Sequence, residues 1–211
     1  MSVINEIYSM MQKGRSKAVK ELIQNALSQG ITAEEILNDA LLASMDEVGE
    51  KFKSGEAYIP EVLVCARAMN AGLEVLKPLL SGEQTKCPGK VCIGTVRGDI
   101  HDIGKNLVKI MLEGKGFEVI DLGTNVEPET FVNTAKEEKC DIICLSALLT
   151  TTRDEMKIVI DEVKNAGIRD KVKILIGGAP ITEEFAKEIG ADAYTPDAAS
   201  AADCALKMCT E

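Results

Sequence analysis

Apolar side chains recur at helical spacing through the first 80 residues of the chain. One stripe covers residues 18–27 and stops at Gly30, a residue that favours the end of a helix. A second stripe follows a capping box formed by Thr32 and Glu35, and a third follows Pro60. A weaker stripe occupies the first turns of the chain. The pattern therefore predicts a four-helix bundle.

A polar segment rich in helix breakers, residues 81–89, separates this half from a different pattern. Beyond it, short apolar runs alternate with helical ones. We expect strands at residues 90–96, 117–120, 141–145, 171–176 and 191–194, and helices led by Thr152, Thr182 and Pro196. Such alternation requires a parallel sheet that helices cover on both faces. The predicted fold is therefore α/β. It has a four-helix bundle at residues 1–84 and a flavodoxin- or Rossmann-like doubly wound five-stranded parallel sheet at residues 85–211.

Composition limits the classes of partner. The 211 residues include 34 acidic and 24 basic side chains, a formal net charge of −10. Nucleic acid and anionic membrane surfaces both attract basic faces, so neither is expected as a partner. The sequence has no apolar run of about 20 residues and no secretory leader pattern, and its seven cysteines form no Cys-x-x-Cys pair. We expect a cytoplasmic protein with reduced thiols.

The chain has a single histidine, His101, which excludes a metal centre built from several histidines. It follows the first predicted strand, and ligands of doubly wound sheets bind where the strand order switches, beyond the carboxyl ends of the strands. Asp99 can accept a hydrogen bond from one imidazole nitrogen and so leave the other as a lone-pair donor. His101 is thus a candidate general base or metal ligand, beside the plainer interpretation of a structural loop histidine.

The surrounding glycines do not fit the familiar nucleotide-binding loops. Gly98 and Gly104 enclose five residues where a Walker A loop has four, and with Gly94 they have the wrong spacing for a dinucleotide fingerprint. A general base needs a reacting partner, and the sequence has no nucleophile elbow or reactive-cysteine setting. A lone histidine ligand needs a metal that brings its other ligands, and a metal bound in a macrocycle meets that condition.

Three loop patterns and one helical pattern carry a family resemblance. The loop patterns are Asp99-x-His101-x-x-Gly104, Ser146-x-Leu148 and Gly177-Gly178. The helical pattern is Met45-x-x-Val48-Gly49-x-x-Phe52-x-x-Gly55-x-x-Tyr58-Ile59-Pro60-Glu61. Together they cover nearly the whole chain. They resemble the cobalamin-binding signature and the cap of methionine synthase and of the small corrinoid proteins of three-component methyltransferase systems.

The resemblance implies cobalamin or a related corrinoid as the cofactor, with methylcobalamin during turnover. His101 would be the axial cobalt ligand, Asp99 would hydrogen-bond its ring, and Ser146 would contact the nucleotide tail or extend this network. The other implied cofactor contacts in the α/β domain are Gly98, Asp102, Ile103, Gly104, Leu148, Thr150, Gly177 and Gly178. Tyr58 and Val62 are expected as cap contacts or as bundle core.

The same resemblance implies a methyl carrier that has no catalytic residues of its own. It would take a methyl group on cobalt from a substrate-specific methyltransferase and pass it to a second methyltransferase that uses a tetrahydrofolate or thiol acceptor. A reductive activase is a further candidate partner. The bundle would cover the methyl face and swing away about residues 81–89. The sequence leaves the donor open among methanol, methylamines, betaine and methoxylated aromatics.

Three other interpretations remain. The small subunit of a radical mutase shares the Asp-x-His-x-x-Gly loop but generally lacks the cap pattern. A cobalamin-dependent sensor needs an output domain, for which the chain has no spare length and no basic helix. A structural α/β protein that has lost its cofactor would not need Asp99, His101, Ser146 and Gly178 to be intact.

Overall fold

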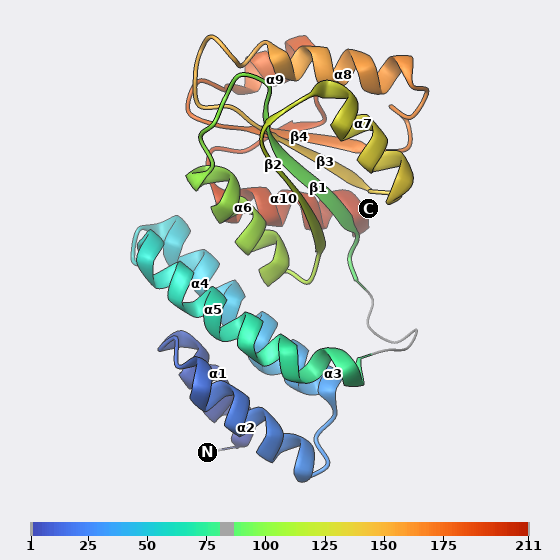
Figure 1. Ribbon diagram of the computed structural model, residues 1–211. Coiled ribbons are helices and arrows are strands. Elements are labelled where there is room, and N and C mark those ends of the chain that lie inside the picture. The colour runs from blue at the N-terminus through green and yellow to red at the C-terminus, as the bar shows by residue number, and fades with distance from the viewer. Residues whose placement is uncertain (1, 81–86, 211) are drawn as a thin grey trace. The chain divides into compact units, whose positions relative to one another are not determined.

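The computed structural model describes residues 2–80 and 87–210, which form two compact units (Figure 1). One unit contains the described residues up to 80 together with Gly114–Gly116, and the other contains residues 87–113 and 117–210. The predicted domain boundary at residue 84 and most of the predicted hinge at 81–89 lie outside the described residues. Both stay predictions.

The helical unit has four main rods, as the apolar stripes predict. Its elements are α1 (Val3–Gln12), α2 (Ser16–Ser28), α3 (Ala33–Ile36), the π-helical η1 (Leu37–Leu42), α4 (Ala43–Ser54), α5 (Ile59–Leu76) and the 3-10 helix η2 (Lys77–Leu79). Because α3, η1 and α4 follow one another without a break, they form one rod. The Thr32 hydroxyl accepts a 3.1 Å hydrogen bond from the Glu35 amide and so caps the start of this rod, as predicted.

Helix α5 is the central packing element of this unit, because it contacts α2, α4 and α1. Its Gly72 allows a close approach: a Cβ there would lie 2.9 Å from Ile23 Cδ1 and 3.0 Å from Leu41 Cδ1. Ile23 and Leu41 are themselves fully buried, so the core has little room to adjust. Among the described residues, no helix combines the length and apolar character that a membrane crossing requires.

The second unit is a five-stranded parallel sheet in the order β2-β1-β3-β4-β5. Its strands are β1 (Lys90–Val96), β2 (Glu118–Val126), β3 (Ile142–Ser146), β4 (Lys173–Gly177) and β5 (Ala193–Tyr194). Its helices are α6 (Ile103–Gly114), α7 (Pro128–Glu137), α8 (Glu155–Asn165), α9 (Glu183–Ile189) and α10 (Ala198–Thr210). The predicted fold class is confirmed, and the strand order is the flavodoxin-like one, which switches between β1 and β3.

The helices cover both faces of the sheet. In Figure 1, α6 and α10 lie on one face, and α7, α8 and α9 lie on the other. On the latter face, Phe131 of α7 and Met156 of α8 pack with Val96 and Ile143 from the strands in one buried cluster. This covering explains why the strands read as continuous apolar runs in the sequence.

The bounds of β3, β4 and β5 differ from the sequence-based prediction by one or two residues, and two larger differences lie near His101. Strand β2 runs six residues beyond the predicted end at 120, although this extension contains Asp121, Gly123 and Asn125. Pairing with β1, through two register shifts, holds this polar extension in the sheet. Helix α8 begins at Glu155 rather than at Thr152, because residues 149–154 form turns. Both differences change the residues that surround His101.

Candidate functional site

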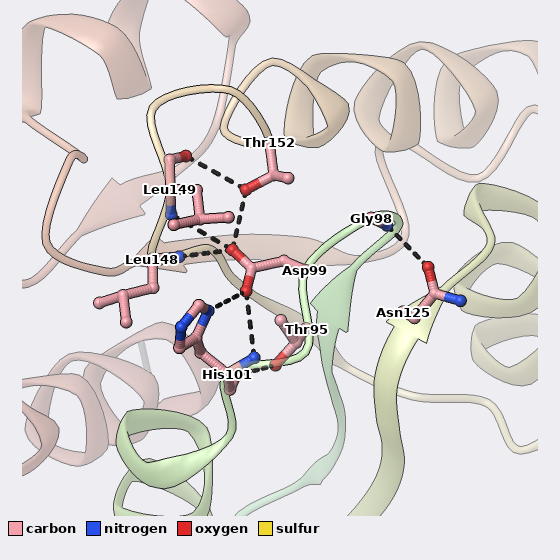
Figure 2. Close-up of polar contacts among 8 residues, drawn as sticks. All are labelled: Thr95, Gly98, Asp99, His101, Asn125, Leu148, Leu149 and Thr152. Atoms are coloured by element: carbon pink, nitrogen blue, oxygen red, sulfur yellow. Dashed lines mark hydrogen bonds and ion pairs between the residues drawn. The ribbon is translucent and has the colours of Figure 1, made fainter.

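The site lies at the switch point, where the loops after β1 and β3 come together. The first loop turns at Gly98, whose φ of +79° suits glycine, and the Asp99 amide donates back to the carbonyl of Val96 at 3.1 Å. This turn directs the Asp99 side chain toward the loop after β3 (Figure 2). Residues about 50 positions apart in the sequence therefore share one small polar cluster.

The Asp99 carboxylate is the centre of that cluster and is fully buried. Its Oδ1 accepts from the His101 amide at 3.1 Å and lies 2.7 Å from His101 Nδ1. The contacts to its Oδ2 come from the amides of Leu148 and Leu149, at 2.8 and 3.3 Å, and from the Thr152 hydroxyl at 2.8 Å. Burial opposes ionisation, but the hydrogen bonds from Leu148, His101 and Thr152 outweigh it and hold the pKa of Asp99 well below its usual range.

An ionised Asp99 fixes the chemistry of His101. A carboxylate can only accept, so Nδ1 carries the proton, and Nε2 is left as a lone-pair donor on the side of the ring away from Asp99. The backbone of His101 is held as well, because the buried Thr95 hydroxyl donates to its carbonyl at 2.8 Å. The side chain remains 46% exposed. This arrangement suits a metal ligand whose orientation is set by the protein.

Large apolar side chains on the same two loops are exposed. Ile100 and Ile103 are 75% and 72% exposed, and Leu148 and Leu149 are also exposed. Exposed apolar groups around a single fixed histidine suit contact with a ligand that has a broad apolar face. The donor set therefore fits a corrinoid: one imidazole nitrogen from the protein, and no other protein ligand needed when the macrocycle supplies the rest.

The glycines predicted as cofactor contacts have different surroundings. At Gly178, with φ at +134°, a Cβ would collide with the carbonyl oxygen of Ala147, so close packing of the β3 and β4 loops already requires glycine there. A Cβ at Gly177 would lie 3.5 Å from the Thr195 carbonyl oxygen, an ordinary contact distance, whereas a Cβ at Gly104 would meet open space. Gly98 provides the turn before Asp99. Their contacts to a cofactor stay predictions.

The side-chain hydrogen bond to Asp99 that we expected from Ser146, as one of its two possible roles, comes instead from Thr152. Within the described chain, none of the hydrogen bonds that Asp99 accepts comes from Ser146, which ends β3 and is half-buried. Thr152 occupies that place, and it is buried despite lying in a run of three threonines. In the sequence, only this run of threonines indicates that a hydroxyl near the site could contact Asp99. Thr95, which holds the His101 carbonyl, has no sequence signal beyond its place near the end of β1.

The remaining predicted site residues lie at the surface, with one exception. Asp102 is exposed and accepts from the side-chain amide of Asn106 at 3.0 Å, and Thr150 is exposed in the loop after β3. Tyr58 is 70% exposed where α5 begins, and its amide donates to Glu61 at 2.6 Å. Val62 is fully buried on the packed stripe of α5. Its burial favours the alternative expectation, that it belongs to the bundle core.

Comparison with known families accounts for both units. Residues 89–203, more than half of the chain, match the B12 binding domain family, and residues 3–77 match a second family of B12 binding domains. The chain belongs to the B12-binding domain family. Membership agrees with the predicted corrinoid cofactor and with the predicted likeness to corrinoid proteins, both of which are confirmed.

Relatives of this B12-binding chain include several corrinoid proteins. Trimethylamine corrinoid protein 1 of Methanosarcina acetivorans is 48% identical over 176 residues, 82% of each chain. A corrinoid protein of Desulfitobacterium hafniense is 38% identical over 211 residues, 99% of this chain and 98% of that one.

Solved structures agree with these relatives. The methanol:cobalamin methyltransferase complex of Methanosarcina barkeri matches with a TM-score of 0.89 and 31% identity, covering 98% of this chain and 79% of that one. A cobalamin-binding protein of D. hafniense matches with a TM-score of 0.80 and 32% identity, covering 97% and 98%. Both matches extend through the helical unit and the sheet of this B12-binding chain.

Proposed function

We propose that this chain is the methyl-carrying corrinoid protein of a methyltransferase system. The observation that carries the proposal is the buried, ionised Asp99, which fixes the chain's single histidine at the switch point of the sheet with Nε2 free to act as a ligand. When bound, the corrinoid supplies a cobalt centre that can accept and release a methyl group. The chain itself supplies the binding surface and the control of the axial ligand.

Each residue of the site has a defined task in this function. His101 Nε2 would be the cobalt ligand, and the contact of Asp99 with Nδ1 selects the tautomer of the neutral ring in which Nε2 carries the lone pair. Thr95 and the Asp99 carboxylate hold the His101 backbone at both its carbonyl and its amide. Ile100, Ile103 and Leu148, whose side chains are exposed, would offer apolar contact to the macrocycle and exclude water from its face. The open space beside Gly104 leaves room for the nucleotide tail.

Partners follow from the names of the relatives. Trimethylamine and dimethylamine corrinoid proteins are 40–48% identical to this chain, the D. hafniense corrinoid protein is 38% identical, and the methanol complex is 31% identical. We therefore place a substrate-specific methyltransferase first among the partners, with methylamines as the first donors to test. A second methyltransferase with a tetrahydrofolate or thiol acceptor, and a reductive activase, complete the proposed system. The match of residues 3–77 to a B12 binding domain favours the carrier over a radical mutase subunit.

Reconstitution of the purified chain with cobalamin tests the ligation step. We expect the wild-type visible spectrum to show histidine coordination, and His101→Ala to bind cobalamin without that signature. Added imidazole should restore coordination in His101→Ala, because the variant keeps the surrounding loops. Lys139→Ala, at an exposed turn before β3, is the control and should match the wild type. Identical spectra for His101→Ala and the wild type would contradict the proposed ligand.

The methyl donor is tested separately. The reduced holo-protein is incubated with methyl-labelled trimethylamine, dimethylamine, methanol, betaine or a methoxylated aromatic, together with the methyltransferase for each. Label that stays with the protein-bound cofactor identifies the donor class. If no combination transfers label while His101 coordination is intact, the carrier role is wrong and the chain is a cobalamin-binding protein of another class.

A further inference from the structure

Asn125, near the end of β2, contacts the histidine-bearing loop from the side opposite the Asp99 carboxylate (Figure 2). Its amide donates to the backbone carbonyl of Asp99 at 2.9 Å. Its side-chain Oδ1 accepts from the Gly98 amide at 2.7 Å. Asn125 therefore holds the backbone before and after the Asp99 α-carbon. One bond acts on the amide of the preceding residue, Gly98, and the other acts on the carbonyl of Asp99 itself.

The backbone of Asn125 adopts a costly conformation to make these contacts. Its φ is +52°, and among the described residues only Lys139 is another non-glycine residue with positive φ. Asparagine tolerates this left-handed region better than most residues, but it still gives up some stability there. Asn125 also lies where the pairing of β1 with β2 shifts register, between Gly94↔Gly123 and Val96↔Val126. Backbone strain of this kind persists in proteins mainly where the surrounding contacts enforce it, and it clusters at functional sites.

We infer that Asn125 is a positioning residue for the axial ligand His101. This rests on the proposed function, because it assumes that His101 binds cobalt. The chain of contacts has three steps: Asn125 fixes the Gly98–Asp99 backbone, the Asp99 carboxylate fixes the imidazole Nδ1, and the imidazole presents Nε2. A small displacement of the Asp99 backbone would move the ring, since the carboxylate and the ring share a 2.7 Å contact.

The side chain of Asn125 affects precision more than folding. Gly98 is exposed, so water can replace the Asn125 oxygen if the side chain is removed. The Asn125 backbone amide would still donate to Asp99. The carboxylate would keep its partners in the loop after β3, and the Thr95 hydroxyl would keep the His101 carbonyl. Loss of the side chain should therefore leave a folded protein in which the first loop is held less tightly.

Substitution at Asn125 separates the side-chain bond from the backbone strain. Asn125→Gly removes the acceptor and relieves the strain, whereas Asn125→Asp keeps an oxygen that can accept from Gly98. Asn125→Ser removes the reach of the side chain without the backbone freedom of glycine. Lys139→Gly is the matched control, because it relieves the same kind of strain at an exposed turn between α7 and β3.

Two readouts are needed, and neither depends on turnover. The visible spectrum of the cobalamin-loaded chain gives the ratio of histidine-ligated to unligated cofactor. The ¹⁵N imidazole signals of the cofactor-free chain report the tautomer, and they are unambiguous because the chain has one histidine. We expect Asn125→Gly and Asn125→Ser to lower the ligated ratio about two- to tenfold, the range that one hydrogen bond provides. Their imidazole signals should also shift toward a tautomeric mixture.

The outcomes distinguish this inference from the function on which it rests. Asn125→Asp and Lys139→Gly should retain the wild-type ratio and imidazole signals. If Asn125→Gly and Asn125→Ser also match the wild type while His101→Ala loses coordination, Asn125 has no positioning role and the axial ligand stands. If Lys139→Gly lowers the ratio as much as Asn125→Gly, the effect is one of general stability and the inference is overturned. If His101→Ala leaves the spectrum unchanged, the proposed function itself falls.

Discussion

The carbonyl oxygen of Ala147 occupies the space that a side chain on Gly178 would need. The two residues lie just beyond β3 and β4, neighbouring strands that pair from Ile142↔Lys173 to Ser146↔Gly177. Their close approach brings the loop that binds the Asp99 carboxylate directly against the loop after β4. The second glycine of the Gly177-Gly178 pair is thus required for packing before any cofactor contact is considered.

Gly178→Ala should be strongly destabilising. The added methyl group would force the two loops apart, and the φ of +134° is one that alanine rarely adopts. We expect the free energy of unfolding to fall by about 2–4 kcal/mol, measured by urea denaturation. Gly167→Ala is the control, because Gly167 has a φ of +69° but no atoms close to the position of a Cβ. It should cost only about 1 kcal/mol; equal losses at both sites would show that the packing contact is unimportant.

Thr152→Val removes one hydrogen bond from Asp99 with little change in side-chain shape. The buried Asp99 oxygen keeps the Leu148 and Leu149 amides, so the fold should survive with a loss of about 1–2 kcal/mol. The ratio of histidine-ligated to unligated cobalamin should also fall, because the carboxylate is held less firmly. Thr151→Val tests the neighbouring exposed hydroxyl and should change neither quantity. A similar response at both positions would mean that the Thr152 hydroxyl is not specific to the site.

Asp121→Asn should weaken the attachment of α6 to β2. The Lys105 ammonium is only 3% exposed and lies 2.5 Å from Asp121 Oδ1, with Lys109 at 3.4 Å from Oδ2. Partial burial raises the pKa of Asp121, but the hydrogen bond from Lys105 outweighs it and the net shift is downward. The substitution leaves the Lys105 charge buried without its partner, so we expect a loss of about 2–3 kcal/mol near neutral pH.

The same pair gives a pH dependence with a defined sign. Because the folded-state pKa of Asp121 lies below its ordinary value of 3.8, its stabilisation is present above that value and is lost as the pH falls through the lower folded-state pKa. The stability of the wild type should therefore decline more steeply below about pH 4 than that of Asp121→Asn. Asp170→Asn, in the exposed turn before β4, is the control and should follow the wild-type curve. Parallel acid limbs for wild type and Asp121→Asn would rule out this contribution.

Deprotonation of Tyr8 should lower the stability of the helical unit at alkaline pH. Its hydroxyl donates to Glu47, which also pairs with Lys51 at 2.5 Å. Burial, together with Glu47, raises the pKa of Tyr8 to about 12. Because the pKa of Tyr8 is higher in the folded state, protonation of its phenol stabilises the fold. This stabilisation is complete below pH 10 and is lost as the pH rises toward about 12.

Ultraviolet absorbance can follow this titration, because the chain has three tyrosines and Tyr8→Phe removes one of them. The wild type should show a late component near pH 12 that is missing in Tyr8→Phe. Tyr58→Phe, at an exposed site, should leave the late component in place. Its loss in Tyr58→Phe instead would assign the raised pKa to the wrong tyrosine.

Much of the site could be predicted from local sequence because its main parts lie close together in the chain. Asp99 and His101 are two residues apart, and the strand before them is an apolar run whose last residue lies at the carboxyl edge of the sheet. The alternation of strands and helices then predicts the parallel sheet, and the rule for doubly wound sheets predicts where a ligand binds. These inferences need no knowledge of how distant segments pack.

The residues that local patterns missed act across long sequence separations. Thr152 meets Asp99 from 53 residues away, and Asn125 meets Gly98 from 27 residues away. Nothing in the Thr150–Thr152 run shows which hydroxyl points inward, and the polar end of β2 resembles a loop. Pairing with β1 and the register shifts decide both the length of β2 and the conformation of Asn125. Tertiary contacts of this kind leave no periodic signal in the sequence.

The order of the strands has a consequence for how the site responds to unfolding. The loops that carry His101, the Asp99-binding amides and Gly178 follow β1, β3 and β4, which each have a strand on both sides. Amide protons of such central strands usually exchange with solvent only through the largest openings of a domain. Partial opening would begin at the edges, at β5 and at β2 with Asn125. His101, the proposed cobalt ligand, is therefore attached to the strands whose amides should be the last to exchange, whereas Asn125 lies on an edge strand.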